Sequence, residues 1–413
     1  MSLWQKLKDP RSEPILQYIL FTGLVVATPF VVVTKYLQNA IFLASHFSFR
    51  LFGFEVPLIL SVATLLCLVL IFRYYRWITL RRAIALIFIV GMLALSHSMM
   101  DLYLDMSFFD LQQNWHYLAY GAYVFFFFRA FGFRGRLSAK MIGYCFASAV
   151  LMSTFDETFQ LFFSGRVFDI SDITKDAWGV LMALILICFV LESYGPMSLK
   201  PARFRQRKFR AYFRHPETML AMLFTLTLIF VFVSPLLTEH SEALPLLGIA
   251  FGAFALIWAT VHFTQNRVFR IFITVFLLVA ASSLAVSYAL HRNANITYAA
   301  YGITVYNGVP IPFFDAMFYP DGGFRLVDKK HHFRSHDIRF FLGRKPDILL
   351  VGSGWRGAGG KGFEVPEGVY FKYNEFTKKG TQVIILPTPE ACKKFNDLKS
   401  EGKKVLFILH NTC

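Results

Sequence analysis

The stretch 217–236, ETMLAMLFTLTLIFVFVSPL, carries no charged residue after its first position. Twenty residues of α-helix are about 30 Å long, which matches the hydrocarbon core of a bilayer. Eight further apolar runs of similar length lie in residues 1–292, at 15–34, 56–73, 83–100, 115–131, 139–160, 177–194, 244–262 and 269–290. The sequence therefore predicts a polytopic, all-α membrane helix bundle with about nine transmembrane helices.

The composition agrees with a membrane protein. Hydrophobic residues make up 56% of the chain and charged residues 16%, whereas a soluble domain usually carries about 25% charged residues. The net charge of +16 lies mostly in short loops between the apolar runs. In that position Lys and Arg set the membrane orientation. We therefore expect membrane lipids, and no nucleic acid, as partners of the basic segments.

Basic and acidic loops alternate along the chain. Lys and Arg crowd the loops 73–82, 129–140 and 200–214, whereas the loops 101–110 and 239–242 are acidic. Because positively charged loops face the cytoplasm, we expect a multi-pass protein of the inner (cytoplasmic) membrane with its N-terminus inside. An odd number of spans then places the C-terminal domain outside the cytoplasm, and an even number would place it inside.

The character of the sequence changes at about residue 295. Asn307-Gly308, after a short strand at 303–305, is a strong hairpin signal. Buried strands are predicted at 347–351, 382–386 and 405–409, with a helix at 389–401 between the last two. A strand, a helix and a strand within about 30 residues form a βαβ unit. Residues 295–413 are therefore predicted to be a small soluble α/β domain.

One stretch, 148–176, concentrates polar residues at the end of an apolar run: SAVLMSTFDETFQLFFSGRVFDISDITKD. Polar side chains within membrane spans are costly and mark candidate functional sites. On a helix, Ser153, Glu157 and Gln160 share one face, and Asp156 points to the adjacent face. This face is expected to reach the outer membrane surface.

Further polar residues meet the same surface by topology. The loop after this helix contains Arg166, Asp169 and Asp172, and His116 begins the fourth run with Tyr120 one turn below it. In a functional site, a partly desolvated Glu157 would serve as acid or base, or would orient His116 as the base. In the structural alternative, Glu157, Arg166 and Asp169 pair and fix the helix end to its loop.

Four motifs carry a resemblance to a known family: WHYLAY at 115–120, DETFQ at 156–160, GRVFD at 165–169 and DITKDAWG at 172–179. In this order and spacing they resemble the VanZ-like membrane domain, over roughly residues 80–195. Gln112, Gln113 and Asn114 stand where that family usually has an Asp-Lys pair, and Asp176 stands in place of the usual Asn. The family is named after a protein that gives low-level resistance to a glycopeptide antibiotic. The resemblance implies an envelope-facing polar site and specifies no reaction.

The polar residues and the resemblance together give two sets of candidate site residues. The candidates for catalysis are His116, Glu157, Arg166 and Asp169, and those for substrate binding are Asp156, Gln160, Asp172, Asp176 and Tyr120. A guanidinium group binds phosphate or carboxylate with two hydrogen bonds, so Arg166 is the natural anion clamp. We expect the site to recognise an amphiphilic component of the cell envelope, such as a lipid phosphate or a lipid-linked glycan, and we leave open whether it also modifies this component. Whether the chain is an enzyme stays open, because the alternative is a non-catalytic scaffold or assembly factor whose C-terminal domain recruits a protein partner.

The tail carries a second resemblance. YPDG at 319–322, KPDILLVGSG at 345–354, VIILPTPEA at 383–391 and HNTC at 410–413 are similar to the adipogenesis-associated domain family. Its relatives include a mitochondrial complex I assembly factor. The resemblance covers roughly residues 297–413 and implies an α/β domain of unknown function that serves as a binding or assembly platform.

Neither a cofactor nor a metal is expected. Gly352, Gly354 and Gly357 form a G-x-G-x-x-G pattern after a strand, but the following residues are small and flexible and predict no helix to hold a pyrophosphate. The five cysteines are scattered and show no CxxC or Cys/His spacing of a metal site.

Overall fold

The computed structural model describes residues 13–32, 40–41, 43–44, 47–51, 54–99, 111–131, 137–162, 168–195, 197, 204–206, 208–237, 243–293 and 295–412. The chain divides into two compact units. The first contains most of the helices, up to Val231, together with Ala253–His262. The second contains Phe232–Gly252 and everything from Phe263 onward.

Every predicted apolar run coincides with a helix in the described part of the chain. The helices are α2 (Glu13–Val32), α4 (Leu58–Tyr74), α5 (Leu80–Met99), α6 (Leu111–Phe131), α7 (Ala139–Gln160), α8 (Ile170–Ile185), α9 (Pro216–Val233), α10 (Ala243–Phe263) and α11 (Arg267–His291). Shorter helical turns are η1 (Tyr75–Trp77), η2 (Leu186–Leu191), η4 (Phe209–Arg214) and η5 (Ser234–Leu236). A hairpin of β1 (Ser48–Leu51) and β2 (Phe54–Pro57) precedes α4.

Six of these helices are long and apolar enough to cross a membrane. They are Leu58–Trp77, Leu80–Met99, Ile170–Leu191, Pro216–Leu236, Leu244–Phe263 and Arg267–His291. The described helices α6 and α7 do not meet this criterion, and they are the helices that carry His116 and Glu157. Nine spans therefore stay a prediction, whereas a multi-pass helical region of about six candidate spans is established.

The helix starts follow from local sequence. Ser138 caps α7 by accepting a hydrogen bond from the Met141 N–H (3.3 Å), and Asn266 caps α11 through the Val268 N–H (2.9 Å). Both residue types are favoured at this position because their side chains satisfy N–H groups that have no partner in the helix. Pro216 begins α9, where its missing N–H costs nothing.

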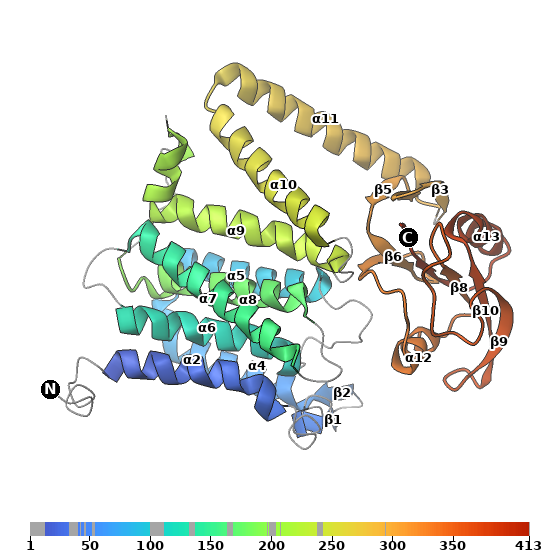
Figure 1. Cartoon of the computed structure of the whole chain (residues 1–413), viewed down its shortest axis with the longest axis horizontal. Helices are drawn as coiled ribbons and strands as arrows, with labels where there is room; N and C mark the ends of the chain where they lie inside the picture. Colours follow the sequence, from blue (N-terminus) through green and yellow to red (C-terminus); the bar gives the residue numbers. More distant parts are fainter. Residues whose placement is uncertain are drawn as a thin grey trace. The chain divides into compact units, whose positions relative to one another are not determined.

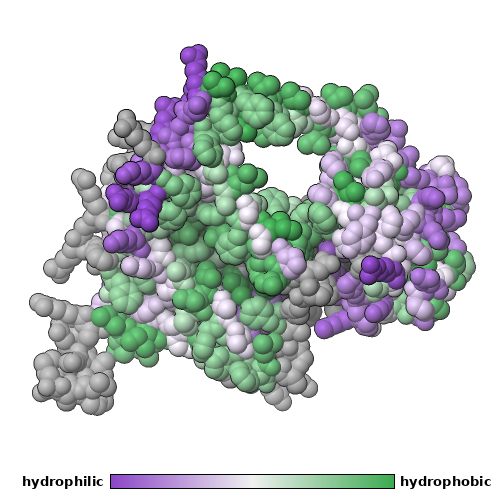
Figure 2. Space-filling view, turned by 45° about the horizontal axis from the view of Figure 1, so that its top comes forward, coloured by the Kyte–Doolittle hydropathy of each residue, from purple (hydrophilic) through white to green (hydrophobic). Residues whose placement is uncertain are grey.

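The helices differ sharply in how they are surrounded. In α4 and α11 no residue is buried, and Figure 2 shows that hydrophobic side chains cover much of the helical surface. Apolar helices without protein partners require lipid around them. Almost every residue of α8, from Ser171 to Ile185, is buried. This helix lies beside α6 and α7, and α2 packs on α6 (Figure 1).

The C-terminal domain contains two sheets. The larger has the order β7-β6-β11-β8-β10-β9 and the smaller β3-β4-β5. The strands are β3 (Ile296–Ala300), β4 (Ile303–Tyr306), β5 (Val309–Pro312), β6 (Asp315–Phe318), β7 (Phe324–Val327), β8 (Ile348–Gly352), β9 (Gly368–Asn374), β10 (Lys379–Leu386) and β11 (Val405–Leu409). The central strands β8 and β11 are buried throughout, which explains their continuous apolar sequences.

Two helices cover this sheet. Helix α13 (Thr388–Ser400) buries Ala391, Cys392 and Phe395 in one core cluster with β8 and β11. Helix α12 (Ser335–Gly343) contributes Ile338 and Phe341 to a second cluster. The domain therefore has helices on both faces of a mixed sheet (Figure 1).

The strand, helix and strand of the predicted βαβ unit follow one another along the chain, but the two strands are not neighbours in the sheet. Helix α13 connects β10 to β11, and both strands pair in parallel with β8, which lies between them. The hairpin predicted at Asn307-Gly308 joins β4 to β5, and both of its turn residues have positive φ (51° and 72°). A Cβ at Gly308 would lie 2.4 Å from the Ser287 carbonyl oxygen, so α11 packs directly on this hairpin.

Candidate functional site

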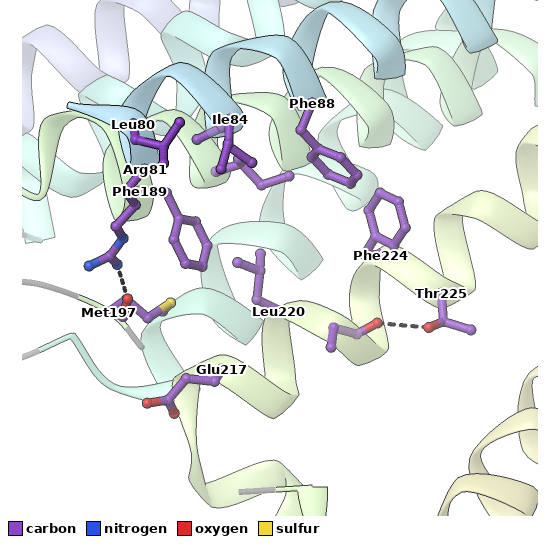
Figure 3. Close-up of a pocket in the computed structure, with 13 residues that line it drawn as sticks. Leu80, Arg81, Ile84, Phe88, Phe189, Met197, Glu217, Leu220, Phe224 and Thr225 are labelled. Carbon is purple, nitrogen blue, oxygen red and sulfur yellow. Dashed lines mark hydrogen bonds between the residues drawn. The ribbon is translucent and has the colours of Figure 1, made fainter. Parts of the chain in front are cut away.

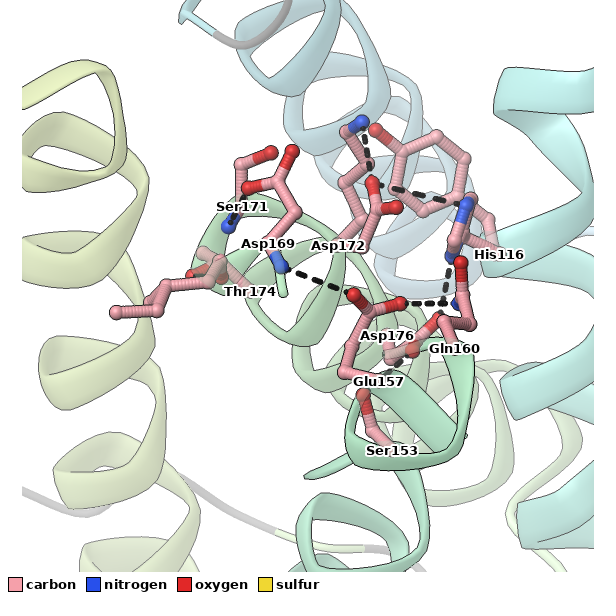
Figure 4. A network of polar contacts seen from close by, with 12 residues as sticks. His116, Ser153, Glu157, Gln160, Asp169, Ser171, Asp172, Thr174 and Asp176 are labelled. Atoms are coloured by element: carbon pink, nitrogen blue, oxygen red, sulfur yellow. Dashed lines mark hydrogen bonds and ion pairs between the residues drawn. The ribbon is translucent and has the colours of Figure 1, made fainter. Parts of the chain in front are cut away.

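The centre of the site is a hydrogen-bonded row of three residues from three helices (Figure 4). The Nδ1 atom of His116, on α6, lies 2.9 Å from Oδ1 of Asp176, on α8. The hydroxyl of Ser153, on α7, donates to Oδ2 of the same carboxylate at 2.6 Å. Ser153 and Asp176 are buried, whereas the His116 side chain stays 21% exposed. A carboxylate that holds one ring nitrogen of histidine fixes the orientation of the ring, so the other nitrogen, Nε2, is the atom available for chemistry.

A glycine makes this close approach possible. A Cβ on Gly179 would lie 2.9 Å from the Cα of Tyr117, so only glycine allows α8 to touch the backbone of α6. Next to it, Trp178 is fully buried and donates from Nε1 to the Met92 carbonyl oxygen at 2.8 Å. The DAWG motif at 176–179 thus supplies the carboxylate, an anchor to α5 and the contact with α6.

A second set of contacts joins the end of α7 to the start of α8. Buried Glu157 accepts a hydrogen bond from Nε2 of Gln160 (2.6 Å) through one oxygen and from the backbone N–H of Asp169 (3.0 Å) through the other. Asp169 caps α8, because its Oδ1 accepts from the Ser171 N–H at 2.7 Å. Glu157 therefore connects the end of α7 to Asp169, the residue that caps α8.

Charged residues complete the open side of the site. Nζ of Lys175 lies 2.8 Å from Oδ1 of Asp172, and the same oxygen lies 3.7 Å from Nε2 of His116. The Asp172 side chain is 25% exposed, whereas Lys175 is buried. His116 is thus placed between two carboxylates, with Asp172 on the exposed side.

The structure brings most of the predicted site residues together, with one change of partner. The carboxylates that contact His116 are Asp176 and Asp172, whereas the described contacts of Glu157 are those with Gln160 and Asp169. We expected Glu157 to orient His116, but in the structure Asp176 holds the ring in this way. The reason is geometric, because Asp176 lies on the face of α8 that Gly179 brings against α6.

The remaining predicted residues are placed as follows. Tyr120 is buried one turn below His116, with its ring centroid 6.1 Å from that of Tyr123. Asp156 is half-buried beside Glu157. Arg166 lies outside the described residues. The sequence interpretation missed Lys175, although a lysine three residues after Asp172, just before an apolar run, was a usable signal.

Comparison with known proteins gives family matches to two segments of the chain. The family model described as VanZ/LLP1 matches residues 58–191, a segment that contains every residue of the network. The chain is a membrane protein with a VanZ-like region. A second model, described as a protein of unknown function (DUF498/DUF598), matches residues 296–410. The two resemblances drawn from the motifs are thereby confirmed.

The other comparisons add little to the VanZ-like region. No curated protein matches the chain. A solved structure titled MT938 is 24% identical, covers 29% of this chain and 98% of its own, and has a TM-score of 0.23. Within the described residues, no group of three or more His, Cys, Asp or Glu side chains is placed to hold a metal ion.

The C-terminal domain contains a second histidine–carboxylate pair that the sequence interpretation missed. Nδ1 of His410 lies 2.7 Å from Oδ2 of Asp315, and Oδ1 of Asp315 accepts from the Asn411 N–H at 2.8 Å. Both side chains are almost completely buried. The sequence signal was weak, because the two residues are far apart and meet only when β6 pairs with β11.

Proposed function

We propose that the VanZ-like region binds the polar head of an amphiphilic cell-envelope component at the site formed by His116, Asp172 and Asp176. The observation that supports this proposal is the one-sided exposure of the network. Its supporting groups Ser153, Asp176 and Lys175 are buried, whereas His116 and Asp172 retain solvent access. A preorganised polar group at the end of apolar helices suits a ligand whose tail stays in lipid.

A lipid phosphate and a lipid-linked glycan are the two candidate ligands, and the arrangement of carboxylates favours the hydroxyl groups of the glycan. Carboxylates accept hydrogen bonds from hydroxyls, whereas they repel a phosphate unless a cation intervenes. Lys175 already pairs with Asp172, so Arg166 is assigned the phosphate of such a ligand. If the site also catalyses a reaction, His116 is the base, with Asp176 as the residue that orients it.

Orientation and boundaries belong to the same proposal. The VanZ-like site faces outward from the inner membrane, the helical domain covers residues 1–292 with nine spans, and the domain of residues 295–413 lies on the outer side. Labelling of Cys413 in intact cells with a membrane-impermeant maleimide tests this arrangement, with a Cys413→Ser variant as control. Labelling before lysis supports an odd span count, and labelling only after lysis contradicts the outer location.

The binding proposal is tested with the full chain in nanodiscs and a fluorescent polyprenyl-linked disaccharide, with polyprenyl phosphate as the competing probe. Asp176→Asn keeps the shape of the side chain but removes the charge that holds His116. We expect at least tenfold weaker binding of the disaccharide. Leu151→Ala, at a lipid-exposed position of α7, is the matched control and should bind like the wild type. Equal affinity of all three proteins would reject the site.

A second candidate function, recruitment of a protein partner by the C-terminal domain, has its own support. Strand β9 is an edge strand, and its outward-facing residues Val369, Phe371 and Tyr373 are 58–71% exposed. An exposed edge with apolar side chains is suited to pairing with a strand of another protein. A photo-crosslinker at Phe371 should give one discrete adduct, whereas the same group at exposed Lys393 should not. Site variants such as Asp176→Asn would leave this adduct unchanged.

A further inference from the structure

A cavity of about 850 Å³ lies between the first turns of α5, the end of α8 with η2, and the first turns of α9 (Figure 3). Its body is formed by apolar side chains, among them Ile84, Phe88, Phe189, Leu220 and Phe224. This volume lies within the range of about 300–1,000 Å³ that is usual for small-molecule sites. Because the lining helices are candidate membrane spans, the molecules that reach the cavity most readily are lipids.

Two charged residues, Arg81 and Glu217, also line the cavity. The guanidinium of Arg81 donates to the Met197 carbonyl oxygen, lies 3.3 Å from Oε1 of Glu192 and leaves its side chain 40% exposed. Glu217 stands in the first turn of α9. Its Oε2 atom is buried and accepts no hydrogen bond from any described residue. A buried carboxylate oxygen without a donor has lost its contacts with water and gained none in return, so this atom indicates a missing donor.

We propose that this cavity binds a zwitterionic phospholipid that carries a primary ammonium group, as phosphatidylethanolamine does. The acyl chain fills the apolar body. The ammonium group donates to Oε2 of Glu217, and the phosphate lies against the exposed side of Arg81. Phosphatidylglycerol would satisfy Arg81 but would offer the Glu217 oxygen only neutral hydroxyl donors, whose hydrogen bonds to a carboxylate are weaker than those of an ammonium.

The cavity is separate from the His116 site. Asp176 and Phe189 stand thirteen positions apart along α8 and η2, which corresponds to about 20 Å. The lipid site therefore lies toward the opposite end of α8, near Arg81 and Arg82 in the first turn of α5, at the end of the helix that is expected to face the cytoplasm. Its occupation does not depend on what the His116 site binds.

Native mass spectrometry of the full chain, extracted from nanodiscs with equal phosphatidylethanolamine and phosphatidylglycerol, tests the proposal. The wild type should retain phosphatidylethanolamine at least tenfold more often than phosphatidylglycerol. Glu217→Gln keeps the shape of the side chain and should reduce this preference to about equal retention. Ala221→Phe, which places a ring in the cavity, should lose both lipids, whereas Val90→Phe, on an exposed part of α5, should behave like the wild type.

Three outcomes would overturn the assignment. Equal retention of the two lipids by the wild type would mean nonspecific lipid only, and an unchanged preference in Glu217→Gln would remove the role of the carboxylate. Phosphatidylcholine serves as the third probe, because its trimethylammonium group cannot donate a hydrogen bond. Retention of phosphatidylcholine equal to that of phosphatidylethanolamine would also contradict the proposal. Asp176→Asn should leave every one of these measurements unchanged, which separates this test from that of the His116 site.

Discussion

The two units of the protein each contain a histidine held by an aspartate, and the two pairs differ in access. The His116–Asp176 pair spans 2.9 Å and the His116 side chain is 21% exposed, whereas the His410–Asp315 pair spans 2.7 Å and His410 is fully buried. In the helical unit the pair lies at helix ends and opens to one side. In the C-terminal domain it connects two strands within the core. The same chemical unit therefore suits ligand binding in one place and structural support in the other.

The largest effect is expected from a substitution that breaks the buried His410–Asp315 pair. Asp315→Ala removes the acceptor of both His410 and the Asn411 N–H. The variant leaves two buried polar groups without a partner, which costs about 1–3 kcal/mol each, so the C-terminal domain should unfold at much lower denaturant concentration. Limited proteolysis of the full chain during urea titration measures this change. Asp397→Ala, at an exposed position of α13, is the control, and similar protease resistance of both variants would show that the buried pair is not structural.

The second prediction concerns the close contact between α6 and α8 that brings Asp176 to His116. Gly179→Val places a branched side chain against the Tyr117 backbone, and overpacking of this kind costs about 1–3 kcal/mol. We expect a lower thermal midpoint together with loss of disaccharide binding. Gly91→Val is the matched control, because nothing lies within 4 Å of its Cβ position. If both glycine variants kept the wild-type midpoint, the close approach of α6 and α8 would not be required.

A smaller effect is expected from Ser153→Ala. The hydroxyl donates to Oδ2 of Asp176, and hydrogen bonds to charged groups contribute about 1.5–3 kcal/mol. Part of this contribution should appear as a lower thermal midpoint and part as several-fold weaker binding at the His116 site. Ser148→Ala serves for comparison, since its hydroxyl donates to the Cys145 carbonyl oxygen of the same helix. Equal effects of the two serine variants would remove the special role of Ser153.

The smallest effect concerns Cys392, on the core side of α13. Burial raises the pKa of its thiol from 9.0 to about 12. The thiolate is the reactive form, so a maleimide at pH 8 should modify Cys392 only after unfolding. Between pH 9 and 12 the unfolded state binds fewer protons than the folded state, and the stability of the domain should fall over this range. Rapid labelling of Cys392 itself in the folded protein at pH 8, located by peptide mapping, would contradict the buried position of this helix face.

Several features could be predicted because they depend on local sequence. The positions of the helices follow from apolar runs, and the β4–β5 hairpin follows from Asn307-Gly308, whose residues tolerate positive φ. The proximity of Glu157 and Gln160 follows from helical spacing. The partner of His116 could not be derived in this way, because it depends on how α6 and α8 are rotated against each other.

The sequence by itself determined that the chain is a multi-pass helical membrane protein followed by an α/β domain, and it indicated the residues of the polar site. Hydrophobic length and turn chemistry are properties of neighbouring residues, so they can be read without a fold. Only the tertiary structure decided that Asp176 holds His116, that Asp315 reaches His410, and that Glu217 lines an apolar cavity. These contacts join residues on separate helices or strands, and they form only when packing fixes the distances between those elements.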